Sequence, residues 1–211
     1  MSDVNYIITR LQQVKIVPVI VIDQAEDIIP LGSALADNGL SVAEITFRTA
    51  CAENAIKLLR EARSDMIVGA GTIVNRTQVC QSKTASAHFI VSPGLNSNTV
   101  KACQEMNIPV IPGVNNPSTI EQALEMDIDF VKFFPAEPSG GIKMLKSLLA
   151  PYQKLRVMPT GGIGMHNLLD YLAIPQVVAC GGSWMVPEQL IRDKNWQEIG
   201  RLAREVSDFI K

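Results

Sequence analysis

The stretch Phe130-Val131-Lys132-Phe133-Phe134-Pro135 is a short apolar run that ends at a proline, with amphipathic stretches at 117–126 and 142–149 on either side. A run of this length between helical patterns is typical of a buried strand in a parallel sheet. The same unit recurs along the chain. We predict strands at 16–21, 42–46, 67–70, 89–91, 110–111, 130–133, 157–158 and 177–180, and helices at 25–38, 52–63, 75–82, 97–106, 117–126, 142–149, 167–172 and 196–210.

Strict alternation of eight strands and eight helices predicts an α/β fold, and a single (β/α)8 TIM barrel fits this count best. A doubly wound sheet usually has fewer strands and a G-x-G-x-x-G loop after the first one. Here Asp23-Gln24-Ala25-Glu26 follows the first strand, and this sequence is a helix start. We expect a short N-terminal helix at about 6–12 to cover the bottom of the barrel. With 211 residues, 47% of them apolar, residues 1–211 are expected to form one domain.

The charge pattern argues against two classes of partner. The net charge is −2 and no block of lysine and arginine occurs, so nucleic acid and anionic membranes are poor candidates. The apolar run at 16–22 is too short to span a bilayer, and residues 1–10 lack the pattern of a signal peptide. We therefore expect a soluble, cytoplasmic protein.

The cysteines and histidines give no metal-binding pattern. Cys51, Cys80, Cys103 and Cys180 are irregularly spaced without a C-x-x-C, and the chain has only two histidines. This inventory argues against a zinc site and a disulfide framework, and suits reduced thiols that act as small core residues. Magnesium bound by carboxylates stays open, although no clustered Asp/Glu motif suggests it. We expect no metal and no cofactor.

Lys132 lies in the middle of the predicted strand at 130–133. Burying an ammonium group without a partner costs several kcal/mol, so this position favours a neutral, nucleophilic amine that can form a Schiff base with a ketone. A lysine that snorkels from the strand end, or that is paired in the core, is the alternative interpretation. Because a buried charge is costly, we expect Lys132→Ala to leave the protein folded.

Strand periodicity brings three further polar residues toward Lys132. Glu44 and Arg48 share one face of the second strand, and Thr72 is expected to share a face of the third with Val68 and Ala70. In a barrel, these side chains would meet at the carboxyl ends of the strands. Glu44 would be the general acid/base, Arg48 would bind a carboxylate, and Thr72 would donate a hydrogen bond. A buried Glu44–Arg48 ion pair, or a turn role for Thr72, remains the alternative.

Paired glycines follow the last two strands. Gly161-Gly162 comes after the seventh strand, and Gly181-Gly182 comes after the eighth, with Ser183 next in the chain. Glycines let backbone N–H groups approach a phosphate closely, and phosphate sites recur at this place in TIM barrels. Residues 183–186, ended by Pro187, are expected to start the short helix of such a site.

Motifs in order along nearly the whole chain resemble the 2-keto-3-deoxy-6-phosphogluconate (KDPG) and 4-hydroxy-2-oxoglutarate aldolase family. The stretches that carry the resemblance are Glu44-Ile45-Thr46-Phe47-Arg48-Thr49, Gly69-Ala70-Gly71-Thr72, Ser92-Pro93-Gly94, Ile111-Pro112-Gly113, Val131-Lys132-Phe133-Phe134-Pro135-Ala136-Glu137, Pro159-Thr160-Gly161-Gly162 and Gly181-Gly182-Ser183-Trp184. The resemblance implies a metal-independent class I aldolase, typically a homotrimer, that acts on a small keto acid or phosphosugar.

The resemblance also implies roles for individual residues. Lys132 would form the Schiff base, Glu44 would move protons, and Arg48 and Thr72 would bind the pyruvyl carboxylate. The implied pocket-lining residues are Pro93, Phe134 and Thr160, and the residues facing the phosphate are Gly161, Gly162, Gly182 and Ser183. Gly164 replaces an expected polar residue after the Thr-Gly-Gly-Ile run, which would loosen that loop.

Other functions on the same scaffold are an aldolase for the galactonate epimer, a phosphosugar isomerase, and a non-catalytic sensor of phosphometabolites. An isomerase needs no amine in the sixth strand. A sensor gains nothing from a costly buried lysine beside a carboxylate. The aldolase for the gluconate-derived substrate is therefore the favoured prediction.

Overall fold

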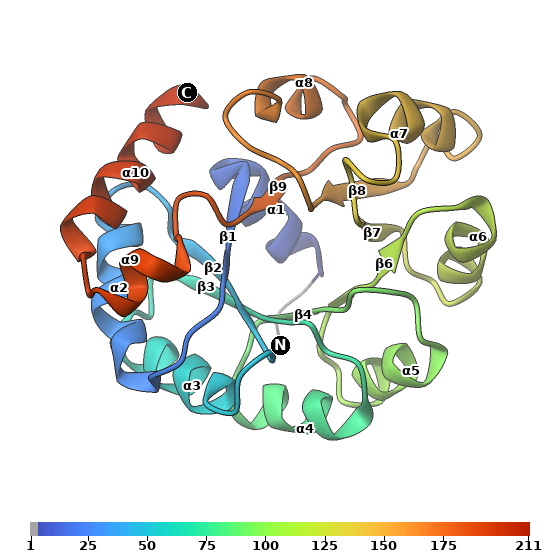
Figure 1. Ribbon diagram of the computed structural model, residues 1–211. Helices are drawn as coiled ribbons and strands as arrows, with labels where there is room; N and C mark the ends of the chain where they lie inside the picture. The colour runs from blue at the N-terminus through green and yellow to red at the C-terminus, as the bar shows by residue number, and fades with distance from the viewer. Residues whose placement is uncertain (1–3) are drawn as a thin grey trace.

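The computed structural model describes residues 4–211, in which strands and helices alternate along the chain (Figure 1). The strands are β1 (Ile16–Ile20), β2 (Val42–Thr46), β3 (Ile67–Gly71), β4 (Phe89–Val91), β5 (Val110–Ile111), β6 (Gly113–Val114), β7 (Phe130–Phe133), β8 (Arg156–Pro159) and β9 (Cys180–Gly182). The helices are α1 (Val4–Val14), the 3-10 helix η1 (Ala25–Asp27), α2 (Ile28–Ala36), α3 (Ala52–Ala62), α4 (Arg76–Thr84), α5 (Ser97–Glu105), α6 (Pro117–Glu125), α7 (Gly141–Leu149), α8 (Leu168–Leu172), α9 (Glu188–Arg192) and α10 (Trp196–Phe209).

All strand pairs are parallel, but they form two sheets. One sheet has the order β5-β4-β3-β2-β1-β9 and the other has the order β6-β7-β8. Pro112 separates β5 from β6 in one extended segment, and a proline has no N–H to continue the ladder. Between β8 and the β9 segment, only the isolated bridges Val157–Val177 and Thr160–Gly181 occur. The predicted α/β fold is confirmed, whereas an uninterrupted closed (β/α)8 sheet is not.

The last strand and the helix after it differ from the prediction. Strand β9 begins at Cys180, while Val177 forms only a single bridge. Residues 183–186 form a turn, with the Val186 N–H donating to the Ser183 carbonyl at 3.0 Å, so the expectation of a helix there is wrong. Helix α9 begins after Pro187 instead. A proline suits that position because the first N–H groups of a helix have no partner within the helix.

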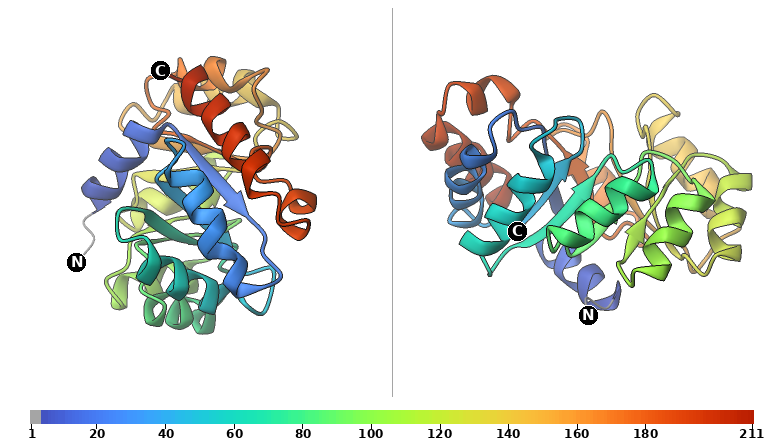
Figure 2. Two further views of the ribbon diagram at one scale, coloured as in Figure 1. Left: turned by 90° about the vertical axis from the view of Figure 1, so that its left-hand side faces the viewer. Right: turned by 90° about the horizontal axis from the view of Figure 1, so that it is seen from below.

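The core has two layers that the alternation of side chains separates. Outward-facing residues such as Ala43, Val131 and Phe133 pack against the ring of helices that surrounds the strands in Figure 1. Inward-facing residues form a second cluster with helix α1. Its members are Ile7, Ile8, Leu11, Val17, Val42, Ile67, Phe89, Val91, Ile111, Phe130, Met158, Val178 and Ala179. Helix α1 lies beneath the sheet, as the right-hand view of Figure 2 shows.

This inner cluster sets the floor of the space enclosed by the strands. Val42 and Phe130 belong to it, and Glu44 and Lys132 follow two residues later on the same strand faces. Two residues of strand correspond to about 6–7 Å along the strand. The apolar cluster therefore fills the lower part of the structure and places two ionisable side chains directly above it.

The four cysteines differ in their burial. All four cysteines are unpaired; Cys103 and Cys180 are buried, and burial raises the pKa of Cys103 to about 12. Cys80 is exposed, so the expectation that every cysteine is a core residue is wrong for it. Within residues 4–211, no helix combines the length and the apolar character needed to cross a bilayer.

His88 ties β4 to β3 and predicts a loss of stability in acid. The imidazole Nδ1 of His88 accepts a hydrogen bond from the Val68 N–H at 2.9 Å, and the backbone N–H of His88 donates to the Val68 carbonyl at 2.8 Å. Burial, and next Arg60, lower the pKa of His88 from 6.5 to about 4. The unfolded chain therefore binds a proton more readily than the folded one between these pH values, and the free energy of unfolding falls as pH decreases through this window.

We expect His88→Asn, which keeps an acceptor for the Val68 N–H, to reduce that decrease by about 1 kcal/mol. Urea unfolding at pH 7 and pH 4.5 measures it, and His166→Asn at the exposed histidine is the control. An unchanged pH dependence in His88→Asn would contradict this interpretation.

Candidate active site

Lys132 and Glu44 form a buried pair at the centre of the fold. Lys132 is 6% exposed on β7, and Glu44 is 0% exposed on β2. The Lys132 Nζ lies 3.6 Å from the Glu44 Oε1, which is too long for a good hydrogen bond. Neither carboxylate oxygen of Glu44 has a hydrogen-bond partner in the described part of the chain. The pair is close enough to exchange a proton while both groups keep hydrogen-bonding capacity for a ligand.

Gly71 makes room for the Glu44 carboxylate. Strand β3 pairs with β2 so that Gly71 lies beside Thr46, and a Cβ built at Gly71 would lie 2.3 Å from the Glu44 Oε1. Side-chain atoms at that distance would displace the carboxylate. Gly71 is therefore part of the site, although the motif Gly69-Ala70-Gly71-Thr72 gave it no role of its own.

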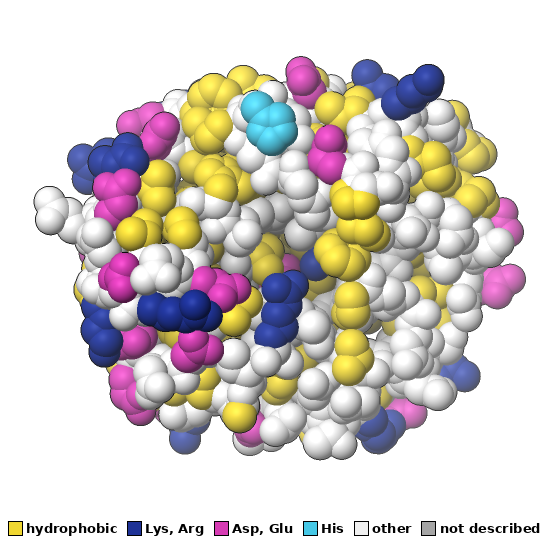
Figure 3. All heavy atoms as spheres, in the orientation of Figure 1, with side chains coloured by type: hydrophobic (Ala, Val, Ile, Leu, Met, Phe, Trp, Pro, Cys, Tyr) yellow, Lys and Arg dark blue, Asp and Glu magenta, His cyan; other side chains and the backbone are white. Residues whose placement is uncertain are grey.

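Phe134 covers the amine from the carboxyl end of β7. The Lys132 Nζ lies 4.9 Å from the centroid of the Phe134 ring. The ring also lines a cavity of about 350 Å³ above the pair. Arg48, which is exposed and has no ion-pair partner among residues 4–211, lines the same cavity. Figure 3 shows this face of the molecule hollowed near its centre, with basic and hydrophobic side chains at the hollow.

The glycine-rich loops line the opposite side of this cavity. Its lining includes Thr160, Gly161, Gly162, Gly182 and Ser183, all five of which the sequence assigned to the site. Thr160 is 7% exposed and its Oγ1 has no hydrogen-bond partner in the described residues. A Cβ at Gly181 would lie 2.6 Å from this Oγ1, so Gly181 leaves space for the threonine hydroxyl.

The loop at 160–162 has its carbonyl groups turned back into the protein. The Ala136 N–H donates to the Thr160 carbonyl at 2.8 Å, and the Glu137 N–H donates to the Gly161 carbonyl at 3.0 Å. The Asn167 Nδ2 donates to the Gly162 carbonyl at 3.1 Å. Both glycines have positive φ, +101° and +82°. Loops with positive φ whose carbonyls are held by the protein can present backbone N–H groups to an anion.

Comparison with known proteins agrees with this arrangement. The model of the family "KDPG and KHG aldolase" matches residues 7–202. The chain belongs to the KDPG and KHG aldolase family. It is 60% identical over 205 residues to the 2-dehydro-3-deoxy-phosphogluconate aldolase of Haemophilus influenzae, covering 97% of each chain. It is 40% identical over 196 residues to the KHG/KDPG aldolase of Escherichia coli K12, covering 93% of this chain and 92% of that one.

A solved structure of the aldolase family is also similar in three dimensions. The KDPG aldolase of Legionella pneumophila, with pyruvate captured at low pH as a covalent carbinolamine intermediate, has a TM-score of 0.90 and 39% identity, with 94% of this chain and 97% of that chain covered. The strands and helices of this chain are thus arranged in space as they are in that aldolase.

Four residues that the family resemblance assigned to the site are not among those that line this cavity. Lys132 and Glu44 lie next to it, because Phe134, which lines the cavity, is 4.9 Å from the Lys132 Nζ. The other two are Thr72 and Pro93. Thr72 is half-buried and its side chain makes no hydrogen bond within residues 4–211, and Pro93 is half-buried with its carbonyl beside Gly113. We expected Thr72 to reach the pocket on the strand face of Val68 and Ala70. That expectation is wrong, because Val68 and Ala70 pack outward. Thr72 has a φ of +60°, which breaks the alternation after β3.

Gly164 does not loosen the aldolase loop in the way the sequence suggested. The backbone at Gly164 is restrained although it has no side chain, because its N–H donates to the Asn167 Oδ1 at 2.9 Å. The Gly164 carbonyl in turn accepts from the N–H groups of Asn167 and Leu168 at 3.2 and 3.0 Å. Asn167 was not predicted as a site residue; an asparagine just before a helix is the only sequence signal that could have indicated it.

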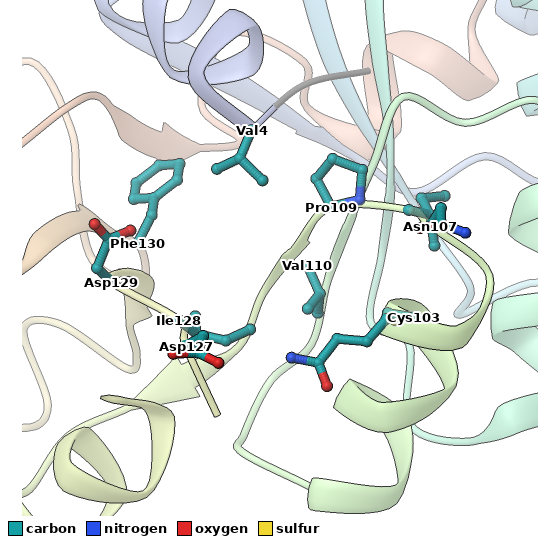
Figure 4. Close-up of a pocket in the computed structure, with 11 residues that line it drawn as sticks. Val4, Cys103, Asn107, Pro109, Val110, Asp127, Ile128, Asp129 and Phe130 are labelled. Carbon is teal, nitrogen blue, oxygen red and sulfur yellow. The ribbon is translucent and has the colours of Figure 1, made fainter. Parts of the chain in front are cut away.

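A larger cavity, of about 510 Å³, lies at the other end of the strands (Figure 4). Its lining includes Val4 and Phe130 from the amino-terminal ends of α1 and β7, and the carboxylate of Asp129 pairs with Arg156 at 2.6 Å. None of the predicted site residues lines it. In barrel enzymes the chemistry lies at the carboxyl ends of the strands, so the smaller cavity is the candidate active site of this aldolase. Among residues 4–211, no three His, Cys, Asp or Glu side chains gather as metal ligands.

The contact between Gly71 and Glu44 gives a direct test of this geometry. We expect Gly71→Ala to lower kcat by about 10²-fold, because displacement of an acid/base group by about 1 Å has effects of that size. Steady-state assays of aldol cleavage, with circular dichroism to verify folding, measure it.

Gly94→Ala is the matched control, since a Cβ at Gly94 meets nothing within 4 Å. It should stay within about twofold of the wild-type rate. Equal effects of the two substitutions would contradict the assigned role of Gly71.

Proposed function

We propose that this protein is a class I aldolase that cleaves 2-keto-3-deoxy-6-phosphogluconate into pyruvate and glyceraldehyde 3-phosphate. The observation that carries the proposal is the buried Lys132–Glu44 pair, 3.6 Å apart, beneath a cavity lined by the glycine loops. The names of the relatives from Haemophilus influenzae and Escherichia coli support the substrate. Cleavage of 4-hydroxy-2-oxoglutarate to pyruvate and glyoxylate is the proposed second activity.

Formation of the Schiff base begins with the amine of Lys132. Glu44 takes the proton of the ammonium group, and the neutral amine attacks the C2 ketone of the substrate. Loss of water, with the carboxyl group of Glu44 moving the protons, leaves an iminium ion on Lys132. The Phe134 ring lies over the Lys132 Nζ, 4.9 Å from it, and shields this position from bulk water.

Carbon–carbon cleavage follows from the positive charge of the iminium. Glu44 removes the proton of the C4 hydroxyl, the C3–C4 bond breaks, and its electron pair flows into an enamine while glyceraldehyde 3-phosphate leaves. Protonation at C3 and hydrolysis release pyruvate and restore the lysine. No step requires a metal ion or an organic cofactor.

The remaining site residues bind the two ends of the substrate. Arg48 would form paired hydrogen bonds with the pyruvyl carboxylate, and Thr72 would add a donor. Phe134 and Thr160, which line the cavity, and Pro93, which lies outside its lining, would surround the middle of the substrate. The N–H groups of Gly161, Gly162 and Gly182, with the Ser183 hydroxyl, would hold the phosphate.

The wider biological setting is part of the same proposal. Residues 1–211 would form one domain, with the two sheets acting as a single (β/α)8 wall through the bridges between β8 and β9. The protein would be a cytoplasmic homotrimer in the Entner-Doudoroff pathway of carbohydrate metabolism. The activity named for the Haemophilus influenzae relative, which is 60% identical over 97% of both chains, supports the aldolase reaction within this setting.

The Schiff base can be trapped on its lysine. Borohydride with pyruvate should add a reduced pyruvyl group to a peptide that contains Lys132, and peptide mass spectrometry locates it. Lys132→Met should remain unmodified. A phosphosugar isomerase or a sensor would show no addition to the wild-type protein either, and that result would overturn the proposed function.

Removal of the lysine also has a predicted effect on stability. The pairing with Glu44 changes the expectation from the sequence, because Lys132→Ala or Lys132→Met leaves a buried carboxylate without its cation. We expect a loss of about 3–5 kcal/mol at pH 7, and recovery of most of it when Glu44→Gln is added to Lys132→Met. Urea unfolding measures both; a single variant as stable as the wild type would show that the pair is not coupled.

Glu44→Gln by itself tests proton transfer. The amide keeps the size of the side chain but cannot exchange protons, so kcat should fall by roughly 10²- to 10⁴-fold. Stopped-flow or coupled assays of pyruvate release give the rate. Wild-type turnover in this variant would remove Glu44 from the mechanism.

A further inference from the structure

Tyr171 on α8 is a buried polar residue that the mechanism above does not use. Its side chain is 0% exposed, and its hydroxyl donates a hydrogen bond of 2.5 Å to the Glu137 Oε1. Burial raises the pKa of the Tyr171 phenol, and the hydrogen bond to Glu137 raises it further. The phenol therefore stays protonated and remains a donor to the carboxylate.

Glu137 connects this tyrosine to the candidate phosphate loop. Its backbone N–H donates to the Gly161 carbonyl at 3.0 Å. Its side chain lies over Gly162: a Cβ built there would be 2.6 Å from the Glu137 Cβ and 2.7 Å from its Cγ. The same residue thus holds one glycine by its backbone and covers the next with its methylene groups.

The conformation of the Glu137 side chain depends on what its carboxylate binds. Glu137 is an exposed residue, and a glutamate side chain that reaches solvent loses rotamer entropy when it is held in one position. Gly141, the first residue of α7, lies beside the same oxygen, since a Cβ there would be 3.1 Å from the Glu137 Oε1. The Tyr171 hydroxyl donates a hydrogen bond to this carboxylate, and this bond fixes the side chain over Gly162.

We propose that Tyr171 is a positioning residue for the substrate phosphate, acting through Glu137 on the Gly161-Gly162 loop. This inference rests on the proposed function and adds a residue outside the cavity to it. The hydroxyl keeps the Glu137 side chain flat against Gly162, and this contact holds the two N–H groups of the loop in the orientation that receives phosphate oxygens. The residue contacts neither the lysine nor the reacting carbons.

Tyr171→Phe tests the proposal because it removes only the hydroxyl. We expect KM for 2-keto-3-deoxy-6-phosphogluconate to rise by about tenfold while kcat stays within about twofold. The rate of borohydride trapping with pyruvate, which has no phosphate, should also stay within about twofold. A change in general stability would alter the trapping as well, so the two readouts separate positioning from folding.

Tyr152→Phe is the matched control. The Tyr152 hydroxyl donates to the Glu121 Oε1 at 2.9 Å, a similar tyrosine–glutamate pair that lies away from the cavity. This variant should keep the wild-type KM. An unchanged KM in Tyr171→Phe, or a rise of the same size in Tyr152→Phe, would overturn the proposal.

Two substitutions of Glu137 complete the test and keep it valid if Tyr171→Phe folds poorly. Glu137→Ala removes the side chain from Gly162 and should raise KM at least as much, and adding Tyr171→Phe to it should change KM no further. Glu137→Gln keeps an oxygen that can accept the bond and should restore most of the affinity. If the increases in KM from Glu137→Ala and Tyr171→Phe were fully additive, that result would contradict the proposal that Tyr171 acts through Glu137.

The same measurements distinguish this inference from the proposed function. Wild-type protein that traps pyruvate, with no difference in KM between the variants, would leave the aldolase mechanism standing and reject the role of Tyr171. Wild-type protein that traps no pyruvate on Lys132 would reject the mechanism itself.

Discussion

The buried pair of Lys132 and Glu44 is the constraint on which the rest of the structure depends. Two ionisable groups removed from water need each other, and replacing either leaves a charge without compensation. The fold holds the pair in place from below with the inner apolar cluster and leaves space for it with Gly71. The separation is 3.6 Å, and no group within residues 4–211 donates a hydrogen bond to the Glu44 oxygens, so both groups are able to react. Because the free energy of removing both groups from water offsets their attraction, the pair adds little net stability, whereas its geometry suits proton transfer.

The second feature of the site is the glycine loop at 160–162, the candidate phosphate loop, whose shape is set by its neighbours. The carbonyls of Thr160, Gly161 and Gly162 accept hydrogen bonds from Ala136, Glu137 and Asn167. Two of these donors follow directly on the strand that carries the lysine. Lys132 and the candidate phosphate loop are consequently linked through one short segment, 134–137, so the backbone fixes the distance between the proposed Schiff-base lysine and the proposed phosphate site.

Sequence reasoning predicted the parts of the site that depend on local pattern. Period-two alternation placed Glu44 and Lys132 on inward faces, and the paired glycines indicated the loops that line the cavity. The predicted face shared by Thr72, Val68 and Ala70 was wrong, because Val68 and Ala70 pack outward and a positive φ at Thr72 interrupts the alternation. Residues 183–186 form a turn, and the helix begins only after Pro187. The sheet that was expected to close is instead interrupted at Pro112, which has no N–H to donate to the strand ladder. The Tyr171–Glu137 contact joins residues 34 positions apart, and no local pattern could have indicated it.

A crystal structure of the protein with pyruvate tests the central claim most directly. The account predicts continuous electron density from the Lys132 Nζ to the C2 of pyruvate, with a Glu44 oxygen within hydrogen-bonding distance of the bound ligand. Pyruvate held without a covalent bond, or joined to another lysine, would contradict it.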